Sequence, residues 1–266
     1  MADRLRGWRK LAGATWTAPK DPQFYGELEL DAAGLLDYVD TARSRSGVHL
    51  TVTHLVGRAV AVGLAEVPAL AVRLSRGRAW PRESIDVFFI VATGDGEELT
   101  GVKVDRANRK SAIAIARELH DRVAAIGRGD DADFGRSKAL LERLPAPLMR
   151  LALRGAAWLT SGLNLDLSRA GMPRQAFGSA MITSVGMWGV ERAFSPLAPY
   201  YRVPLLVLVG AVTQRPVVRD GEVVVRPMLT LTATFDHRYA DGAHAARFAA
   251  AIRRYCADPA AFEPAD

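Results

Sequence analysis

The sequence predicts a layered α+β fold. Two stretches, 24–30 and 229–235, carry apolar residues at every second position, which is the period of a half-buried strand. Two others, 51–67 and 111–126, carry apolar residues at helical spacing, and the two kinds of segment follow one another along the chain. The 266 residues are 49% hydrophobic and contain no long Pro/Ser-rich linker, so we expect a single domain over residues 1–266.

The first elements are bounded by helix start and stop residues. Residues 24–30 alternate as a strand, and Asp31 is placed to cap the helix that follows. Thr51 or Thr53 opens a second helix, which ends before Pro68. Because this second helix is apolar almost all round, we expect it to be buried.

The middle of the chain continues the pattern. Residues 85–92 form a continuous apolar run and residues 99–104 a shorter one, and both are typical of strands. Residues 111–126 are amphipathic with helical spacing, and Gly127 is placed to end that helix.

The C-terminal third combines a hairpin with a strand-to-helix corner. Asp220-Gly221 lies among valines, which predicts a tight hairpin turn. His237 comes just after the strand 229–235, and Asp241 is placed to cap a helix with Phe248 on its apolar face. The corner therefore presents an imidazole as a candidate catalytic group, although an ordinary turn explains the same residues without catalysis.

Two motifs in this region resemble those of one family. The stretch Phe-Asp-His-Arg-Tyr-Ala-Asp-Gly-Ala at 235–243 is similar to the Asp-His-Arg-x-x-Asp-Gly-Ala motif of 2-oxoacid dehydrogenase acyltransferase (E2) catalytic domains. The stretch 178–190 resembles the Gly-Thr-Phe-Thr-Ile-Ser-Asn-Leu-Gly-Met-Phe-Gly segment of those domains, and the motifs occur in the same order. The resemblance implies a chloramphenicol acetyltransferase-like layered sandwich with a mixed β-sheet and flanking helices.

The resemblance also implies roles for three residues. His237 matches the histidine that acts as general base, and Thr183 stands where the family has an oxyanion-stabilising serine. Because threonine is stiffer at χ1, Ser184 is an alternative donor. Asp241 matches an acidic or amide position that organises the site, with Arg9 as one candidate partner.

The implied reaction moves an acyl group between coenzyme A and a thiol acceptor such as dihydrolipoamide. A base must deprotonate the attacking thiol, and a donor must hold the oxyanion that forms. An amine or hydroxyl acceptor is a second possibility within this fold. The rival interpretation is a non-catalytic trimeric or cage-forming scaffold, favoured by the change from serine to threonine.

The resemblance further implies partners. E2 proteins carry lipoyl and subunit-binding domains before the catalytic domain, and we expect none on this chain, because no such segment precedes Arg9. The acyl carrier is then another polypeptide or a free thioester. In the family the site lies between subunits, so we expect a homotrimer, which can assemble into a larger cage.

Residues 128–177 form a longer segment than the corresponding part of an ordinary E2 catalytic domain. The part over 139–160 combines a Leu, Met and Trp stripe with interspersed arginines, which is typical of an amphipathic helix. The helix can lie on a membrane or a partner. We favour packing of the stripe on the protein's own core or on a sister subunit.

Composition excludes several other functions. The net charge of +6 comes mainly from scattered arginines, which argues against nucleic-acid binding but suits an anionic ligand such as coenzyme A. The chain shows neither a signal peptide nor a membrane-spanning run, so we expect a cytoplasmic protein without membrane contact. The single Cys256 is expected to be structural, and no histidine pair has metal-ligand spacing, so we expect no metal. Gly186 and Gly189 are expected to form a tight turn after the strand that carries Thr183, and Gly242 to allow close approach of helix and strand.

Overall fold

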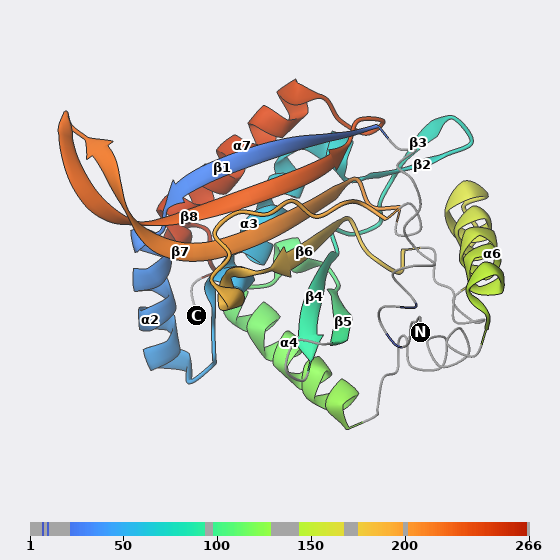
Figure 1. Cartoon of the computed structure of the whole chain (residues 1–266), viewed down its shortest axis with the longest axis horizontal. Helices are drawn as coiled ribbons and strands as arrows, with labels where there is room; N and C mark the ends of the chain where they lie inside the picture. Colours follow the sequence, from blue (N-terminus) through green and yellow to red (C-terminus); the bar gives the residue numbers. More distant parts are fainter. Residues whose placement is uncertain are drawn as a thin grey trace, which may run out of the picture.

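A six-stranded mixed sheet forms the centre of the protein (Figure 1). The computed structural model describes residues 22–93, 98–128, 144–167, 175–198 and 202–264, together with residues 7 and 10. The strands of the sheet are, in spatial order, β1 (Gln23–Asp31), β8 (Glu222–Asp236), β7 (Leu205–Arg219), β6 (Ala180–Ser184), β4 (Val87–Thr93) and β5 (Glu98–Val104). Strand β6 is parallel to both of its neighbours and the other pairs are antiparallel, so the sheet is mixed as the resemblance implies.

One face of the sheet is covered by helices. They are α2 (Ala33–Ser46), α3 (Val52–Glu66), α4 (Ala112–Gly127) and α7 (Gly242–Ala257), joined in part by the short helical turns η1 (Pro68–Leu70), η2 (Ala107–Arg109) and η6 (Pro259–Ala261). Helix α3 contacts α4, α7, β4 and β6, and it buries Leu55, Val60 and Leu64 completely. The prediction that this apolar helix is buried is therefore confirmed. A helix that is apolar on all sides leaves water only when other elements surround it.

The helix caps largely follow the sequence. Thr51, one of the two candidates, is the N-cap of α3 and forms a capping box with His54. Ser111 caps α4 by accepting a hydrogen bond from Ala114 N at 3.1 Å. The prediction for α2 was wrong by one residue, since its N-cap is Ala32. Asp31 still accepts the hydrogen bond of the Ala33 N–H, at 3.0 Å, so its carboxylate satisfies an N-terminal donor from just outside the helix.

The long hairpin of β7 and β8 extends beyond the rest of the sheet as an arm (Figure 1). Asp220 and Gly221 both have positive φ, 51° and 84°, as the predicted turn requires. Strand β1 pairs with β8 only from Met228 onward, so the distal part of the hairpin pairs only with itself. Each strand runs without a break for 15 residues, whereas the sequence pattern suggested shorter strands.

A second hairpin and a helical segment lie at the opposite edge from the arm (Figure 1). The hairpin joins β2 (Val72–Ser75) to β3 (Arg78–Pro81), and its short arginine-rich strands give no apolar alternation by which the sequence could predict them. The segment contains α6 (Ala146–Ala157) and the π-helical turn η3 (Trp158–Gly162), which fall within or next to the predicted amphipathic stretch 139–160. Residues 139–143 of that stretch lie outside the described residues.

The two faces of α6 differ in burial. Met149, Leu153 and Ala157 are buried, as the favoured interpretation of packing on the protein predicts. Leu148 and Leu151 on the other face are exposed. None of the helices in the described ranges is both long enough and apolar enough to cross a membrane.

Glu263 ties the C-terminal segment to three helices. Its carboxylate accepts hydrogen bonds from the Tyr255 hydroxyl at 2.7 Å and from Ala112 N at 2.6 Å, and it lies 3.4 Å from Nε of Arg58. The side chains of Glu263 and Arg58 are only 4% and 9% exposed. The two terminal guanidinium nitrogens of Arg58 donate to the carbonyls of Asn108 and Phe262, whereas Nε has only its ion-pair contact with Glu263.

We predict that Glu263→Ala lowers the free energy of unfolding by about 3–5 kcal/mol, because it leaves the Arg58 guanidinium buried without its counter-charge. Urea unfolding followed by circular dichroism measures this change. Glu66→Ala is the matched control, since Glu66 pairs with Arg254 at the surface and should cost about 0–1 kcal/mol. Equal losses in the two variants would contradict the prediction.

Candidate active site

His237 lies on a tight turn directly after β8. Its main-chain N–H donates to the carbonyl of Pro22 at 2.7 Å, which ties the turn to the start of β1. Its ring packs against Phe24 with centroids 4.9 Å apart, and Phe24 in turn stacks on Phe235. The residue is exposed, so the imidazole has an aromatic wall on one side and is accessible from solvent.

The residues on either side of His237 hold the turn in shape. The Asp236 carboxylate, which is buried, accepts from the main-chain N–H of Arg238 at 3.0 Å and from its guanidinium Nε at 2.9 Å. Tyr239 N also donates to the Asp236 carbonyl at 3.0 Å. Sequence reasoning placed Asp236 and Arg238 within the 235–243 motif but gave neither a role of its own. A bidentate carboxylate and arginine pair is rigid, so these two residues fix the backbone that carries His237.

The Asp241 side chain contacts the first turn of the helix that it starts. Its Oδ1 accepts from the main-chain N–H of His244 at 3.1 Å and lies 2.6 Å from Nδ1 of His244. The backbone hydrogen bond from His244, followed by the side-chain one, lowers the pKa of Asp241. Sequence reasoning missed His244 as the partner, although Asp-x-x-His is the spacing of a capping box. Arg9, the suggested partner, lies outside the described residues.

Thr183 lies on β6 and faces the side of the sheet that the helices do not cover. Its neighbour Ile182 belongs to the helix-covered core, while Met181 belongs to a smaller apolar cluster on the other face. Ser184, the alternative donor, points back into the sheet, where its hydroxyl donates to Val209 O at 3.4 Å. The Ser184 hydroxyl is therefore engaged by the neighbouring strand, on the opposite side of β6 from Thr183.

The sheet register keeps Thr183 and His237 apart within one chain. Thr183 is level with Leu208 of β7, which is level with Thr232 of β8, and His237 lies five residues farther along. With about 3.3 Å per residue along a strand and about 4.8 Å between strands, the two Cα atoms are roughly 15–20 Å apart. The structure thus brings His237 and Asp241 onto one corner and leaves Thr183 at a different place on the sheet.

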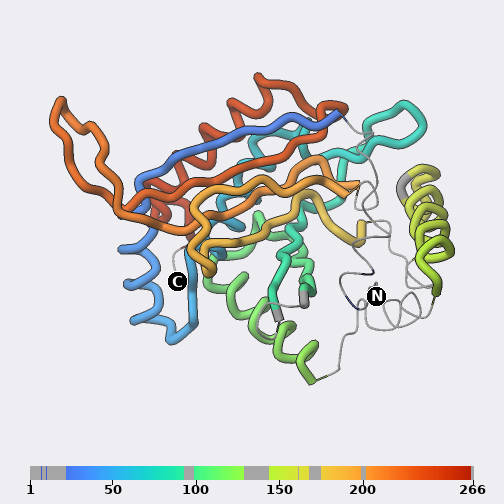
Figure 2. Tube along the Cα trace, viewed as in Figure 1, coloured from blue at the N-terminus to red at the C-terminus, as the bar shows by residue number. Residues whose placement is uncertain are grey.

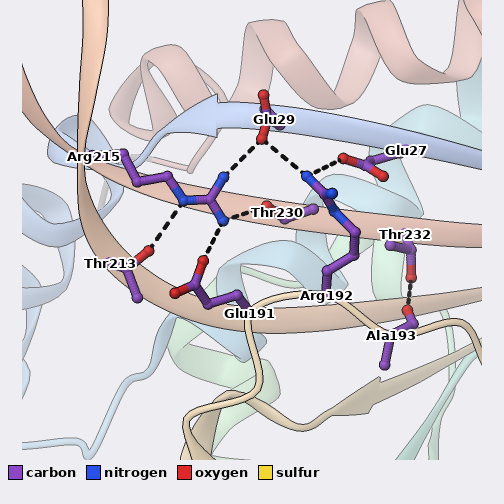
Figure 3. A network of polar contacts seen from close by, with 9 residues as sticks. All are labelled: Glu27, Glu29, Glu191, Arg192, Ala193, Thr213, Arg215, Thr230 and Thr232. Atoms are coloured by element: carbon purple, nitrogen blue, oxygen red, sulfur yellow. Dashed lines mark hydrogen bonds and ion pairs between the residues drawn. The ribbon is translucent and has the colours of Figure 1, made fainter.

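The segment after Thr183 crosses the face of the sheet that the helices leave open, and β8 holds it there (Figure 3). The hydroxyls of Thr232 and Thr234 donate to the carbonyls of Ala193 and Ser195, the second bond measuring 2.7 Å. Both threonines are almost fully buried. These bonds satisfy hydroxyls that would otherwise be stranded inside the protein, so they fix the path of the chain.

A network of ion pairs lies at the edge of the same segment (Figure 3). Arg215 of β7 contacts Glu29 of β1 at 2.7 Å and Glu191 at 2.6 Å, and the hydrogen bond with Glu191 raises the pKa of Arg215. Arg192 contacts Glu27 at 2.8 Å and Glu29 at 3.3 Å. Because these groups are partly exposed, each pair contributes little alone, but together they tie three parts of the chain to one place.

Two of the three predicted glycine roles are confirmed. Gly186 begins the helical turn η5 (Gly186–Trp188) that follows the Thr183 strand, and Gly189, with a φ of +74°, ends it. A Cβ on Gly186 would also come within 2.6 Å of the Gly210 carbonyl. Gly242 was assigned to close packing of helix on strand, and this was wrong. A Cβ at Gly242 would meet nothing within 4 Å, because the first turn of α7 begins at the surface.

The remaining titratable candidates have structural surroundings. Burial, followed by repulsion from His49 and His120, lowers the pKa of His54 to about 4, and its Nδ1 accepts from Thr51 N at 3.0 Å. Cys256 is buried in the core, and burial raises the pKa of its thiol to about 12. Across the described ranges, no group of three or more His, Cys, Asp or Glu side chains is arranged to hold a metal ion.

The sequence matches the model of a known protein family over most of its length. The family model for the 2-oxoacid dehydrogenases acyltransferase (catalytic domain) matches residues 4–130 and 172–263. The acetyltransferase component of the acetoin cleaving system of Bacillus subtilis is 27% identical over 83% of this chain and 45% of its own length. The lipoamide acyltransferase component of the branched-chain alpha-keto acid dehydrogenase complex of Pseudomonas putida is 33% identical. That match covers 44% of this chain and 29% of the relative. The chain thus spans less than half the length of these relatives.

Solved structures show the same fold. A probable dihydrolipoamide acetyltransferase from Listeria monocytogenes has a TM-score of 0.72 at 22% identity, covering 97% of this chain and 94% of the other. The dihydrolipoamide acetyltransferase of Azotobacter vinelandii has a TM-score of 0.71 at 22% identity, covering 98% of this chain and 93% of the other. That enzyme was studied for the roles of a serine, a histidine and an asparagine in its catalytic mechanism. Chloramphenicol acetyltransferase has a TM-score of 0.53 at 14% identity, and the match covers 89% of each chain. The predicted fold class is therefore confirmed.

We predict that Cys256 does not react as a nucleophile. At pH 8 a thiol with a pKa of about 12 has about a thousandfold less thiolate than a free cysteine, and burial also blocks access. Native protein should leave an aromatic disulfide reagent unreacted over minutes, whereas protein unfolded in guanidinium should release one equivalent of chromophore. Rapid reaction of the native protein would show the prediction to be wrong.

Proposed function

Because the chain belongs to the 2-oxoacid dehydrogenase acyltransferase catalytic-domain family, we propose that it is a coenzyme A-dependent acyltransferase. The observation that carries the proposal is the exposed imidazole of His237 on a turn fixed by Asp236, Arg238 and Pro22. A general base must be both accessible and held in place, and this turn supplies both conditions.

The proposed reaction moves an acyl group from coenzyme A to a thiol. The His237 imidazole takes the proton from the acceptor thiol, and the thiolate attacks the carbonyl carbon of the acyl-coenzyme A thioester. The Thr183 hydroxyl donates a hydrogen bond to the oxyanion of the tetrahedral intermediate. As the intermediate collapses, the carbon–sulfur bond to coenzyme A breaks, and the imidazolium returns its proton to the departing thiolate. Dihydrolipoamide on a carrier protein is the acceptor suggested by the names of the relatives.

Asp241 has a positioning role in this proposal. It caps α7 and so fixes the end of the turn that carries His237. In the Azotobacter relative, the histidine and the asparagine under study are four residues apart, the same separation as that between His237 and Asp241. That agreement supports a shared arrangement of the corner rather than proton transfer by the carboxylate.

The separation of Thr183 from His237 supports an active site between subunits. Neither side chain can bridge roughly 15–20 Å, so one chain cannot place both groups on the same carbonyl. A closed ring of copies solves this geometrically, because each copy can present its histidine to the threonine of the next. We therefore propose a homotrimer as the active unit, which can assemble further into a cage.

We predict that His237→Ala lowers acetyl transfer from acetyl-coenzyme A to dihydrolipoamide about 10²–10⁴-fold. Thr183→Ala should lower it about 10²–10³-fold, and Thr183→Ser should keep most of the rate because the hydroxyl remains. Chromatographic measurement of the coenzyme A released and the acetyl-dihydrolipoamide formed gives the rate, and His49→Ala serves as a control at an exposed histidine outside the site. If no protein, including the unmodified one, transfers acetyl or binds coenzyme A, the non-catalytic scaffold becomes the better proposal.

The same two variants test the intersubunit arrangement. When His237→Ala and Thr183→Ala chains are dissociated, mixed in equal amounts and reassembled, about one quarter of the sites in a ring should receive both intact groups. The mixture should recover about that fraction of the unmodified rate, while each variant reassembled alone should not. Mixed oligomers that form, as judged by mass spectrometry, but stay inactive would exclude a shared site.

The distal arm of β7 and β8 is a candidate for holding the copies together. Val218, Val223 and Val225 are 71%, 73% and 66% exposed on the hairpin, and Val218 is directly opposite Val223. An apolar β-ribbon that projects into solvent is costly unless another surface covers it. A second copy of the chain is the partner that assembly of the ring would supply.

We predict that Val223→Glu shifts the assembled protein to a smaller species, because burying a carboxylate among apolar groups costs several kcal/mol. Size-exclusion chromatography with light scattering measures the change. Ala124→Glu, which adds the same charge at an exposed position of α4, should leave the assembly intact. A Val223→Glu protein of unchanged mass would remove the arm from the interface.

A further inference from the structure

One corner of the molecule has no part in the proposed acyl transfer. It is formed by α6, η3 and the β2–β3 hairpin, which lie together at the edge opposite the arm (Figure 2). The Ser75 hydroxyl of β2 donates to the carbonyl of Gly162 at the end of η3 at 2.7 Å, and the Arg73 guanidinium contacts the side chain of Asn164. The helical segment and the hairpin are thus fixed to one another.

This corner exposes an unusual amount of apolar surface. Leu148, Leu151 and Trp158 are 52%, 67% and 58% exposed, and their spacing places them on one side of the helix, away from the buried Met149. Trp80 of the hairpin is 39% exposed. A row of leucine and tryptophan on the outside of a helix is costly to hydrate and indicates a binding surface.

The charged side chains of these elements are all positive. Arg76 and Arg78 are exposed on the hairpin, and Arg154 is exposed beside the apolar row on α6. Residues 72–82 and 144–163 contain no aspartate and no glutamate. A surface of this charge attracts an anionic partner and repels a cationic one.

We propose that this surface, the α6 corner (Trp80, Leu148, Leu151 and Trp158 with Arg76, Arg78 and Arg154), docks on an anionic phospholipid membrane. A helix with leucine and tryptophan on one side and arginine beside them lies in the plane of the membrane, with its apolar side in the headgroup and acyl boundary. Tryptophan is enriched at that boundary, and arginine pairs with lipid phosphates. This proposal departs from the sequence-based expectation that the chain makes no membrane contact.

The shape of the surface favours a membrane over other anionic partners. The exposed row is a ridge on the outside of a helix, and a ridge needs a protein partner with a matching groove, whereas a bilayer accepts it without one. Nucleic acid would use the arginines but would leave the leucine row in water. The row also lies within residues 131–171, which the family model does not match, so the proposal does not rest on the proposed acyl transfer.

Sedimentation with phospholipid vesicles tests the proposal. The full chain should bind vesicles of phosphatidylglycerol and phosphatidylcholine at physiological salt and should not bind phosphatidylcholine alone. Trp158→Ala and Leu151→Ser should each weaken partition into anionic vesicles about tenfold, and Arg76→Glu with Arg78→Glu should abolish it. Trp188→Ala, at a tryptophan that is 50% exposed on the turn η5 (Gly186–Trp188), should bind normally.

The controls separate docking from other causes. Arg45→Glu with Arg247→Glu changes the net charge by the same amount on other exposed helices and should keep binding. Light scattering and thermal unfolding of each variant report assembly and folding. The proposal is overturned if the unmodified chain ignores anionic vesicles, if the control pair loses binding equally, or if Trp158→Ala dissociates the oligomer, which would assign the row to a contact between copies.

Discussion

The register of three neighbouring strands is the constraint on which the functional interpretation of this protein depends. Parallel pairing of β6 with β7, and antiparallel pairing of β7 with β8, place Thr183 in the middle of the sheet while His237 follows the end of β8. Backbone hydrogen bonds fix these offsets, and a slip of one residue would turn every core side chain of a strand to the other face. The distance between the two groups is therefore not adjustable within one chain, and chemistry that uses both requires a second copy.

The histidine corner shows how a short motif becomes a rigid site. The charged residues that flank His237 have separate structural roles, since Asp236 and Arg238 brace the turn while Asp241 caps the next helix. Pro22 and Phe24, from the far end of the chain, supply a backbone acceptor and an aromatic wall for His237. In the proposed mechanism His237 is the general base, and a residue held from both sides without being buried meets the needs of that role.

The two faces of the sheet are stabilised by different interactions. The helix-covered face depends on burial of apolar side chains of α3, α4 and α7. The opposite face carries the segment after Thr183, and there the decisive bonds are those of the buried Thr232 and Thr234 hydroxyls to main-chain carbonyls. The arginine and glutamate network at the edge is partly exposed and adds less, because water and salt weaken such pairs.

The sequence alone determined the features that depend on nearby residues. Alternation predicted the strand before His237, Asp220-Gly221 predicted the hairpin, and Thr51, Ser111 and Asp241 predicted helix starts, because caps and turns are set by interactions over a few residues. Two motifs indicated the family and hence the fold. Tertiary structure decided the rest, namely the turning of Ser184 into the sheet, the pairing of Asp241 with His244, the distance from Thr183 to His237, and the exposure of one side of α6. Those depend on strand register and on which surface another element covers, and neither is encoded in any short stretch of the chain.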